Sequence, residues 1–457
     1  MLLNYRLITL IALLSSMILT SCQISKPDLA RLYQSNNHSN ITQPPVILIH
    51  GIMGSKLRDI DSLEEIWFGN LFKLLFSNFT SVKLAINPET LEPVENRLEA
   101  FEIADQAAGT DFYRAIIDTL QKFAGYKIST PGVFDPEVKR KLYLFNYDWR
   151  QDNQLSAKKL SKFIKQIKQD HQNPDLEFDI IAHSMGGLIT RYYLRYGEDD
   201  VLNDNDFPLN LEGAKNIRKV ILLGTPNLGS VGAVRSFIQG LKVGLRNVPT
   251  EVLATMPSIY QLFPHSINNW IINEKGEAID MDVFDIETWR SLNWSIFDPN
   301  VRNRITKDQQ NGERYLETLE AYFAKHIERA RRFVWSLTIP VENPGYRLVV
   351  MGGDCELTPA RMLLERDNDG QTIIRLKPNK IKNPHPGVDY NALMLEPGDG
   401  TVTKASLLAR DALDPTIPRH KYSYFPIDYP YFLCEPHSTL TSNINFQDNL
   451  LNILLSR

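Results

Sequence analysis

The sequence predicts an α/β fold in which a mostly parallel β-sheet is flanked by helices and carries a large, mainly helical cap insertion. Short β-branched or apolar runs alternate with stretches of helical periodicity along most of the chain. One such run, at 178–181, passes through the pentapeptide AHSMG at 182–186 into another helical stretch. Two long stretches, 55–130 and 231–338, do not follow the alternation. We therefore interpret both stretches as insertions into one sheet-based core.

Six apolar runs are expected to be the strands of the sheet. They are residues 46–50, 141–146, 178–182, 219–223, 347–351 and 422–425. Between the second and third runs, residues 160–168 place apolar side chains at helical spacing and lysines on the other face. We expect a helix whose lysine face contacts solvent, and a patch for lipid headgroups is the alternative. A final helix is expected at 443–455.

The stretch 231–338 is expected to form a cap over the site. Its apolar side chains fall on one helical stripe near its start and on another near its end. The first stripe contains Val231, Val234, Ile238, Leu241 and Leu245, and the second contains Leu319, Phe323, Ile327, Ala330 and Val334. Such inserts carry substrate choice, although the stripes could instead pack only on the main core. The core then comprises 45–230, with an insert at about 55–130, and 339–457.

The N-terminal residues have the layout of a bacterial lipoprotein leader. An apolar run at 7–19 is too short to span a membrane and is typical of a secretory signal. The residues LTSC at 19–22 resemble a lipobox, so we expect 1–21 to be a signal peptide and Cys22 to be acylated. Residues 22–44 form a polar tether, and Gln23 favours the outer membrane of the cell envelope. An ordinary signal peptide with a chance cysteine is the alternative.

The composition is that of an ordinary globular protein. The net charge is −4 and 43% of the residues are hydrophobic, so no basic excess or reading motif points to nucleic acid. The Cys and His residues show no metal-ligand spacing. Cys355 and Cys434 can pair in an oxidising compartment or remain buried thiols, and the sequence leaves both possibilities open.

Ser184 is the candidate nucleophile. A serine hydroxyl needs a base and donors for the developing oxyanion, and a sharp strand-to-helix turn holds it out of the sheet. Such a turn needs small residues two before and two after the serine, as Ala182 and Gly186 are. The glycine-rich turn HGIMGS at 50–55 follows the first strand. The amides of Ile52 and Met185 are therefore the candidate oxyanion donors.

The base and the acid are expected in the C-terminal part of the chain. His437 follows the last expected strand and precedes the final helix, whereas the competing His420 lies at the wrong end of that strand. Asp399 lies between two glycines that let its carboxylate turn inward. Asp354 is its rival because it follows the fifth strand more closely. The acid would fix the imidazole tautomer and stabilise the imidazolium.

Four further polar residues are expected to be structural. His50 and His183 flank the two turns of the site, and we interpret them as bracing these loops. Asp148 and Arg150 follow the second strand and are most simply a structural pair or a backbone clamp. A substrate role for this pair is the alternative.

With these residues in place, the chain resembles the lecithin:cholesterol acyltransferase and lysosomal phospholipase family of α/β-hydrolases. The resemblance rests on residues 46–55, 147–150, 182–188, 224–226, 398–402 and His437, which occur in the order of the family. It implies a lipid acyl hydrolase or acyltransferase with the triad Ser184, Asp399 and His437 and without a cofactor. The chain departs from mammalian members, which have Pro or Ser in place of His50 and Gly in place of Ala182.

The sequence therefore predicts a lipoprotein that cleaves carboxylic esters of lipids, such as phospholipids or acylglycerols, through an acyl-enzyme. Its partners would be a lipid ester and the membrane that holds its anchor. A carboxylesterase or thioesterase acting on small soluble esters is a second hypothesis. A surface-binding lipoprotein without catalysis is a third, and the complete triad argues against it. Hydrolysis and acyl transfer are not distinguished by the residues, and neither is the oligomeric state.

Overall fold

The computed structural model describes residues 26–37, 42–69, 79–94, 97–104, 106–107, 110–111, 113–308, 311–366, 372–411, 413, 416 and 425–456. The expected signal peptide with Cys22, the competing base His420 and most of the strand expected at 422–425 lie outside these residues. Within them, no helix is both long enough and apolar enough to cross a membrane.

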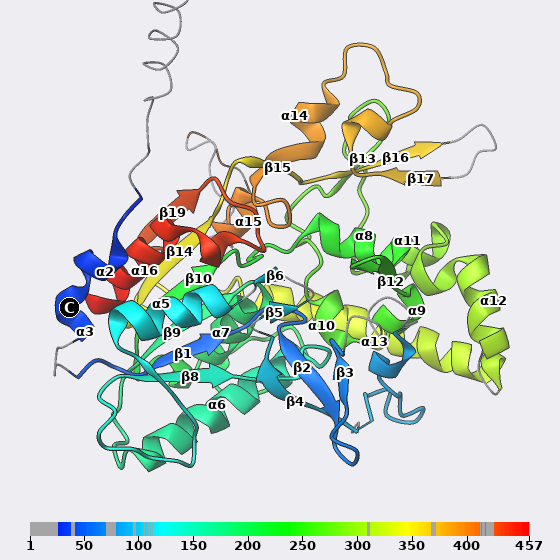
Figure 1. Cartoon of the computed structure of the whole chain (residues 1–457). Coiled ribbons are helices and arrows are strands. Elements are labelled where there is room, and N and C mark those ends of the chain that lie inside the picture. Colours follow the sequence, from blue (N-terminus) through cyan, green and yellow to red (C-terminus); the bar gives the residue numbers. More distant parts are fainter. Residues whose placement is uncertain are drawn as a thin grey trace, which may run out of the picture.

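A seven-stranded parallel sheet forms the centre of the molecule (Figure 1). Its spatial order is β19-β14-β10-β9-β1-β8-β7, and every neighbouring pair is parallel. The strands are β1 (Val46–Ile49), β7 (Lys127–Ser129), β8 (Lys141–Phe145), β9 (Phe178–His183), β10 (Ile217–Leu223), β14 (Arg347–Gly353) and β19 (Tyr429–Leu433). Because all its connections cross over, the carboxyl ends of the strands meet at one edge. The expected parallel sheet is confirmed.

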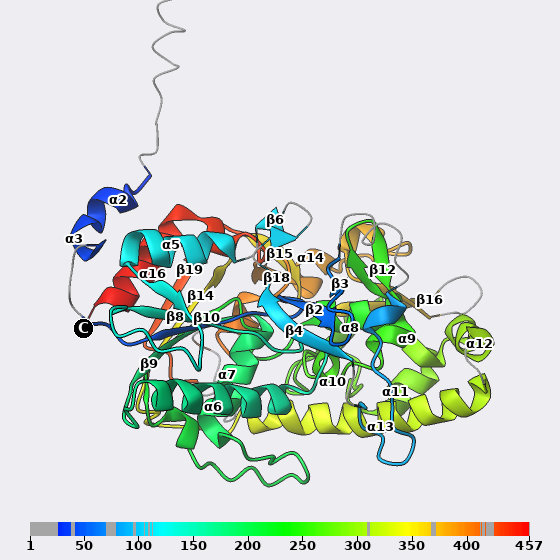
Figure 2. The same cartoon turned by 60° about the horizontal axis from the view of Figure 1, so that its bottom comes forward.

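Helices cover both faces of this sheet (Figure 2). Alternate strand residues point to opposite faces, so Ile47 and Ile49 pack with the side that carries α6 (Asn153–Asp170) and α7 (Met185–Tyr196). Val46 and Leu48 pack with the side that carries α5 (Arg114–Ala124) and α16 (Ile444–Leu455). The four residues of β1 are fully buried, which explains its unbroken apolar sequence.

The described edge strand at this end of the sheet lies further along the chain than the expected strand at 422–425, of which only Phe425 is described. Phe425 lies outside any strand, and the edge strand β19 begins only at Tyr429. Proline cannot donate to a sheet ladder, and Pro426 and Pro430 divide the apolar run at this end of the chain. Pro430 is tolerated within β19 because, among the described strands, only β14 pairs with it. The sequence also gave no signal for β7, a three-residue strand at the other edge.

The chain between β10 and β14 is largely helical (Figure 1). It contains α8 (Val231–Gln239), α9 (Thr250–Leu253), α10 (Pro257–Tyr260), α11 (Ile286–Ser291), α12 (Pro299–Asp308) and α13 (Gly312–Ser336). The stripe expected on α13 is buried, and Phe237, Trp289 and Phe323 join an aromatic cluster inside this segment. The same continuous core reaches the sheet, and Phe333 of α13 stacks on Tyr192 of α7.

The first apolar stripe of this segment ends earlier than expected. Gly240 has a φ of 85° and ends α8, and Gly244 with a φ of 59° makes the turn of a hairpin. Leu241 therefore lies in β11 (Leu241–Val243), and Leu245 at the tip of the hairpin is 81% exposed. The helical interpretation of these two leucines was wrong, because two glycines outweigh the apolar spacing.

Short elements project beyond the central sheet. The small sheets are formed by β2 (Ser55–Asp59), β3 (Glu65–Trp67) and β4 (Leu98–Ile103); by β5 (Gln106–Ala107) and β6 (Thr110–Asp111); by β11 and β12 (Arg246–Val248); by β13 (Ile271–Ile272), β16 (Met362–Arg366) and β17 (Thr372–Arg375); and by β15 (Glu356–Pro359) and β18 (Leu395–Gly398). The remaining helices are α2 (Leu29–Leu32), α3 (Gln34–Asn37), α14 (Tyr390–Met394) and α15 (Lys404–Leu407). The strands β2 to β7 and the helix α5 all lie within the stretch 55–130 that did not follow the alternation.

Replacement of Leu319 by Ala tests whether α13 belongs to the common core. Leu319 is fully buried, so we expect the free energy of unfolding to fall by about 2–5 kcal/mol, measured by urea denaturation. The matched control is Leu245→Ala, which removes an exposed leucine and should change stability by less than about 0.5 kcal/mol. Equal effects of the two substitutions would contradict a shared core.

Candidate active site

Ser184 lies on the turn between β9 and α7. Its φ of 53° and ψ of −125° form a backbone conformation that is costly for a residue with a side chain. The turn is held because the Ser184 N–H donates to the carbonyl of Leu223 at 2.7 Å. A Cβ at Gly186 would lie 2.4 Å from the His50 carbonyl oxygen, and one at Gly187 would lie 2.0 Å from Thr225 Oγ1. The turn therefore needs glycine on its helical side.

Asp399 and His437 form a direct acid–base pair. His437 Nδ1 lies 2.7 Å from Asp399 Oδ2, and the His437 N–H donates to the Asp399 carbonyl at 2.9 Å. The other carboxylate oxygen accepts from the backbone N–H groups of Thr401 and Val402. Because Nδ1 donates to the carboxylate, Nε2 is the ring nitrogen available to accept a proton.

This pair lies at the same edge of the sheet as Ser184. Gly224 follows β10 directly, and a Cβ there would lie 2.9 Å from the His437 ring and 3.1 Å from Asp399 Oδ2. The preceding residue, Leu223, holds the Ser184 amide. The rings of His183 and His437 are 4.8 Å apart between centroids. The structure thus brings the three predicted residues to one place at the end of β9 and β10.

Asp354, the rival for the acid, is engaged elsewhere, and so is Asp389. Asp354 forms an ion pair with Lys404 at 2.7 Å, and Asp389 caps the N-terminus of α14. Among the described residues, neither carboxylate forms a hydrogen bond or ion pair with a histidine.

Burial and charge act in opposite directions on the pair. Burial by itself lowers the pKa of His437, but the charge of Asp399 and its hydrogen bond leave that pKa above the ordinary value. Burial by itself raises the pKa of Asp399, but His437 and the two backbone donors leave that pKa below the ordinary value. The arrangement therefore stabilises a carboxylate beside an imidazolium.

The two candidate oxyanion donors lie next to Ser184. The turn at Gly51 approaches so closely that a Cβ on Gly51 would lie 2.8 Å from the Ser184 Cβ. Met185 is the first residue of α7, so its N–H has no acceptor within the helix. Among the described residues, the Ile52 N–H makes no hydrogen bond either. Both amides can therefore serve a developing negative charge.

Tyr113 is a site residue that sequence reasoning missed. Its hydroxyl accepts from the Gly51 N–H at 2.8 Å and lies 2.9 Å from His183 Nδ1. It comes from the start of α5, inside the stretch 55–130, where no motif marked it. Burial lowers the pKa of His183 to about 3, so this ring is neutral near pH 7. As expected, His183 braces a loop of the site.

Asp148 and Arg150 form the expected structural pair. The Arg150 guanidinium donates to both carboxylate oxygens of Asp148, at 2.8 and 2.7 Å, and to the Val82 carbonyl at 3.2 Å. Both side chains are buried. Arg150 thus connects the residues that follow β8 to the segment around Val82.

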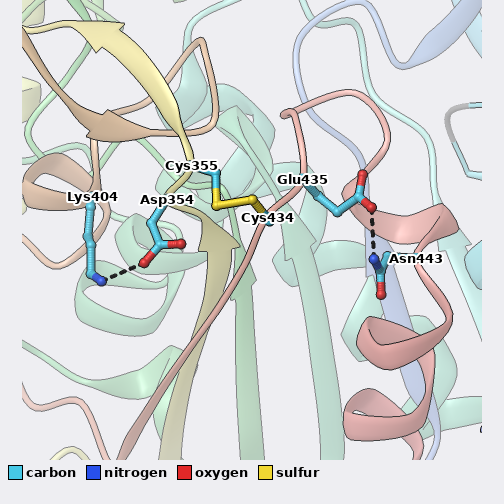
Figure 3. Close-up of a disulfide and its surroundings, with 6 residues drawn as sticks. All are labelled: Asp354, Cys355, Lys404, Cys434, Glu435 and Asn443. Atoms are coloured by element: carbon cyan, nitrogen blue, oxygen red, sulfur yellow. Dashed lines mark hydrogen bonds and ion pairs between the residues drawn. A yellow bond between two sulfur atoms is a disulfide. The ribbon is translucent and has the colours of Figure 1, made fainter. Parts of the chain in front are cut away.

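A disulfide joins Cys355 and Cys434 (Figure 3). It links the residues after β14 to the loop that carries His437 three positions further on. An Asp354–Lys404 ion pair flanks it on one side and a Glu435–Asn443 hydrogen bond of 2.8 Å on the other. The bridge therefore ties the loop that carries His437 to the end of β14, the strand next to the edge strand β19. In the described part of the chain, no group of three His, Cys, Asp or Glu side chains is arranged to hold a metal ion.

Comparisons with known proteins identify the family of the chain. The family model for lecithin:cholesterol acyltransferase matches residues 135–408. An uncharacterized protein of Saccharomyces cerevisiae, YJR098C, is 24% identical over 56% of this chain and 34% of its own length. Lecithin-cholesterol acyltransferase-like 4 of Arabidopsis thaliana is 23% identical over 54% of this chain and 50% of its own length. The chain thus spans half or less of the length of these curated relatives.

A solved structure supports the fold over most of the chain. A chain in the crystal structure of the Tle4–Tli4 complex superposes with a TM-score of 0.53 and 15% identity, covering 90% of this chain and 98% of that chain. The parallel sheet, its two helical layers and the serine turn define an α/β-hydrolase. Within that class, the chain belongs to the lecithin:cholesterol acyltransferase family, as the match over 135–408 shows.

Replacement of Asp399 by Asn tests the electrostatic role of the carboxylate. Without the negative charge, burial dominates, so the pKa of His437 should fall below its value in the unmodified protein. The measurement is a titration of the imidazole nitrogens by NMR. An unchanged pKa would show that the carboxylate does not act on this ring.

The same pair makes stability depend on pH. A lowered pKa of Asp399 stabilises the fold above its unfolded value of about 4, and a raised pKa of His437 stabilises it below about 6.5. The contribution is thus complete between these values and is lost as the pH falls or rises through the folded pKa values. Asp399→Asn should remove this dependence in denaturation measured across the range.

Replacement of Cys355 by Ser tests the disulfide. The bridge closes a loop with a sequence separation of 79, so its loss should lower the free energy of unfolding by about 2–5 kcal/mol. Dithiothreitol should lower the melting temperature of the unmodified protein similarly and leave the variant unaffected. A melting temperature unaffected by both changes would contradict a structural bridge.

Proposed function

We propose that the protein is a serine-dependent acyl hydrolase or O-acyltransferase that acts on carboxylic esters of lipids through an acyl-enzyme. The observation that carries the proposal is the Asp399–His437 pair positioned beside the strained turn of Ser184. This combination of nucleophile, base and orienting acid is the requirement for activating a serine hydroxyl. Family membership supports a lipid ester as the substrate class.

The proposed reaction has two halves, acylation of Ser184 and release of the acyl group, and the same groups act in both. Ser184 attacks the acyl carbonyl while His437 Nε2 takes the hydroxyl proton, and Asp399 stabilises the imidazolium without accepting that proton. The amides of Ile52 and Met185 bind the oxyanion. His437 then protonates the leaving alcohol, and the acyl group remains on Ser184. Water releases it as a carboxylate, or a second alcohol accepts it, by the same steps in reverse.

The place of action is part of the proposal and rests on the sequence alone. Acylation of Cys22 would attach the protein to the outer membrane, and the polar residues up to 44 would form the tether. An enzyme held at a bilayer meets lipid esters at high local concentration. The choice of headgroup, acyl position and acceptor belongs to the cap and is not specified by the residues at Ser184.

Replacement of Ser184 by Ala is the central test. Hydrolysis of medium- and long-chain nitrophenyl esters should fall by about 10⁴-fold or more, because the covalent intermediate is no longer accessible. A fluorophosphonate probe should label the unmodified protein and fail to label the variant. Turnover that survives the substitution would refute the serine mechanism.

Ser129→Ala is the matched control. Ser129 lies in the edge strand β7, and its hydroxyl donates to a backbone carbonyl two residues away. This variant should keep full turnover.

Mass spectrometry of products formed from total membrane lipid distinguishes hydrolysis from acyl transfer, because hydrolysis yields free fatty acid and transfer yields a new acyl ester.

A further inference from the structure

We propose that His50 is a positioning residue that sets the direction of the Ile52 amide toward the oxyanion. The inference rests on the proposed function and adds a role that the three residues of the triad do not supply. Its basis is the set of hydrogen bonds around the two peptide units on either side of Gly51. These bonds come from His50 itself, from Gly54 and from two buried tyrosines.

The peptide unit between Gly51 and Ile52 is held by its carbonyl. His50 Nδ1 lies 2.7 Å from the Gly51 oxygen, and the Gly54 N–H donates to the same oxygen at 3.1 Å. In a planar trans peptide the C=O and N–H bonds point in opposite directions. Fixing the Gly51 carbonyl therefore fixes the Ile52 N–H, which is the candidate oxyanion donor.

The hydrogen bonds of His50 determine which ring nitrogen carries the proton. A carbonyl oxygen only accepts, so Nδ1 must be the donor toward Gly51. Nε2 then accepts from the Ser55 hydroxyl, with which it is in contact. Burial lowers the pKa of His50 to about 3, so the ring holds a single proton near pH 7. Ser55 thus selects the tautomer that the turn requires.

The position of the ring is restricted from both sides. It stacks on Tyr147 with the ring centroids 4.1 Å apart and the planes 2° from parallel. On the other side, a Cβ at Gly54 would lie 2.7 Å from His50 Nδ1, so only glycine leaves room for the imidazole. His50 has no exposed surface. The ring can therefore hold the turn with little freedom of its own.

The preceding peptide unit is held at both of its ends. The Tyr147 hydroxyl donates to the His50 carbonyl at 2.7 Å, and the Gly51 N–H donates to the Tyr113 hydroxyl at 2.8 Å. Tyr113 in turn contacts His183, the residue before Ser184. The oxyanion turn and the serine turn are thus connected through buried side chains. Donors fixed in this way need no reorganisation when negative charge develops.

The test compares His50→Leu with His50→Asn. Leucine cannot donate, whereas the Asn side-chain nitrogen can occupy the place of Nδ1. Loss of one oxyanion donor costs about 10²–10³ in kcat, and a displaced donor should cost about 10–100-fold in His50→Leu. His50→Asn should keep kcat within about 5-fold, and KM for a soluble nitrophenyl ester should stay within about 3-fold in both variants.

Two further variants keep the test decisive if His50→Leu does not fold. Ser55→Ala removes the hydroxyl that selects the tautomer, and Tyr113→Phe removes the acceptor of the Gly51 amide together with its contact to His183. Both should lower kcat by about 3–10-fold with little change in KM. Tyr143→Phe is the control, since its hydroxyl contacts His171 at 3.2 Å near the opposite edge of the sheet.

The outcomes separate this inference from the proposed function. Full kcat in His50→Leu, together with an inactive Ser184→Ala, would overturn the role of His50 and leave the serine mechanism intact. A higher KM at unchanged kcat would also overturn it, because it would indicate substrate binding in place of oxyanion alignment. Activity retained by Ser184→Ala would refute the serine mechanism itself. Loss of kcat in His50→Leu with recovery in His50→Asn supports the alignment.

Discussion

The backbone turn at Ser184 is the constraint on which the rest of the site depends. Its unfavourable φ and ψ persist because the elements around it leave no alternative: the Leu223 carbonyl holds its amide, and α7 passes directly over the end of β1. Glycines at 186 and 187 make this passage possible, since a side chain at either position would collide with His50 or Thr225. The packing around the sheet therefore offsets the conformational cost of this turn.

The acid and the base reach this turn from a distant part of the chain. Asp399 follows β18 and His437 follows β19. The two loops that carry them lie so close to Gly224 and Gly353 that a Cβ on either glycine would collide with both loops. Each group would be unfavourable alone in this buried place, and the pair offsets the cost through its mutual charge and the backbone donors. The Cys355–Cys434 bridge then limits how far the base loop can move from the sheet.

Hydrogen bonds attach the segment from α8 to α13 to the core near both of its ends. It leaves at Ser230, whose hydroxyl donates to the Thr401 carbonyl next to the acid, and it returns along α13, where Ser336 accepts from Tyr196. The aromatic cluster inside it belongs to the same continuous core as the sheet. This segment is therefore joined to the core next to the loop of Asp399 as well as along α13.

The sequence by itself determined the parallel sheet, its main helices and the order of Ser184, Asp399 and His437. These features depend on local periodicity and on short motifs, which can be recognised from the order of residues alone. Only the tertiary structure decided the partners of Tyr113, the pairing of Cys355 with Cys434 and the position of β19. These features depend on which residues meet across large separations in sequence. The direction of the Ile52 amide belongs with them, because side chains from three separate segments define it.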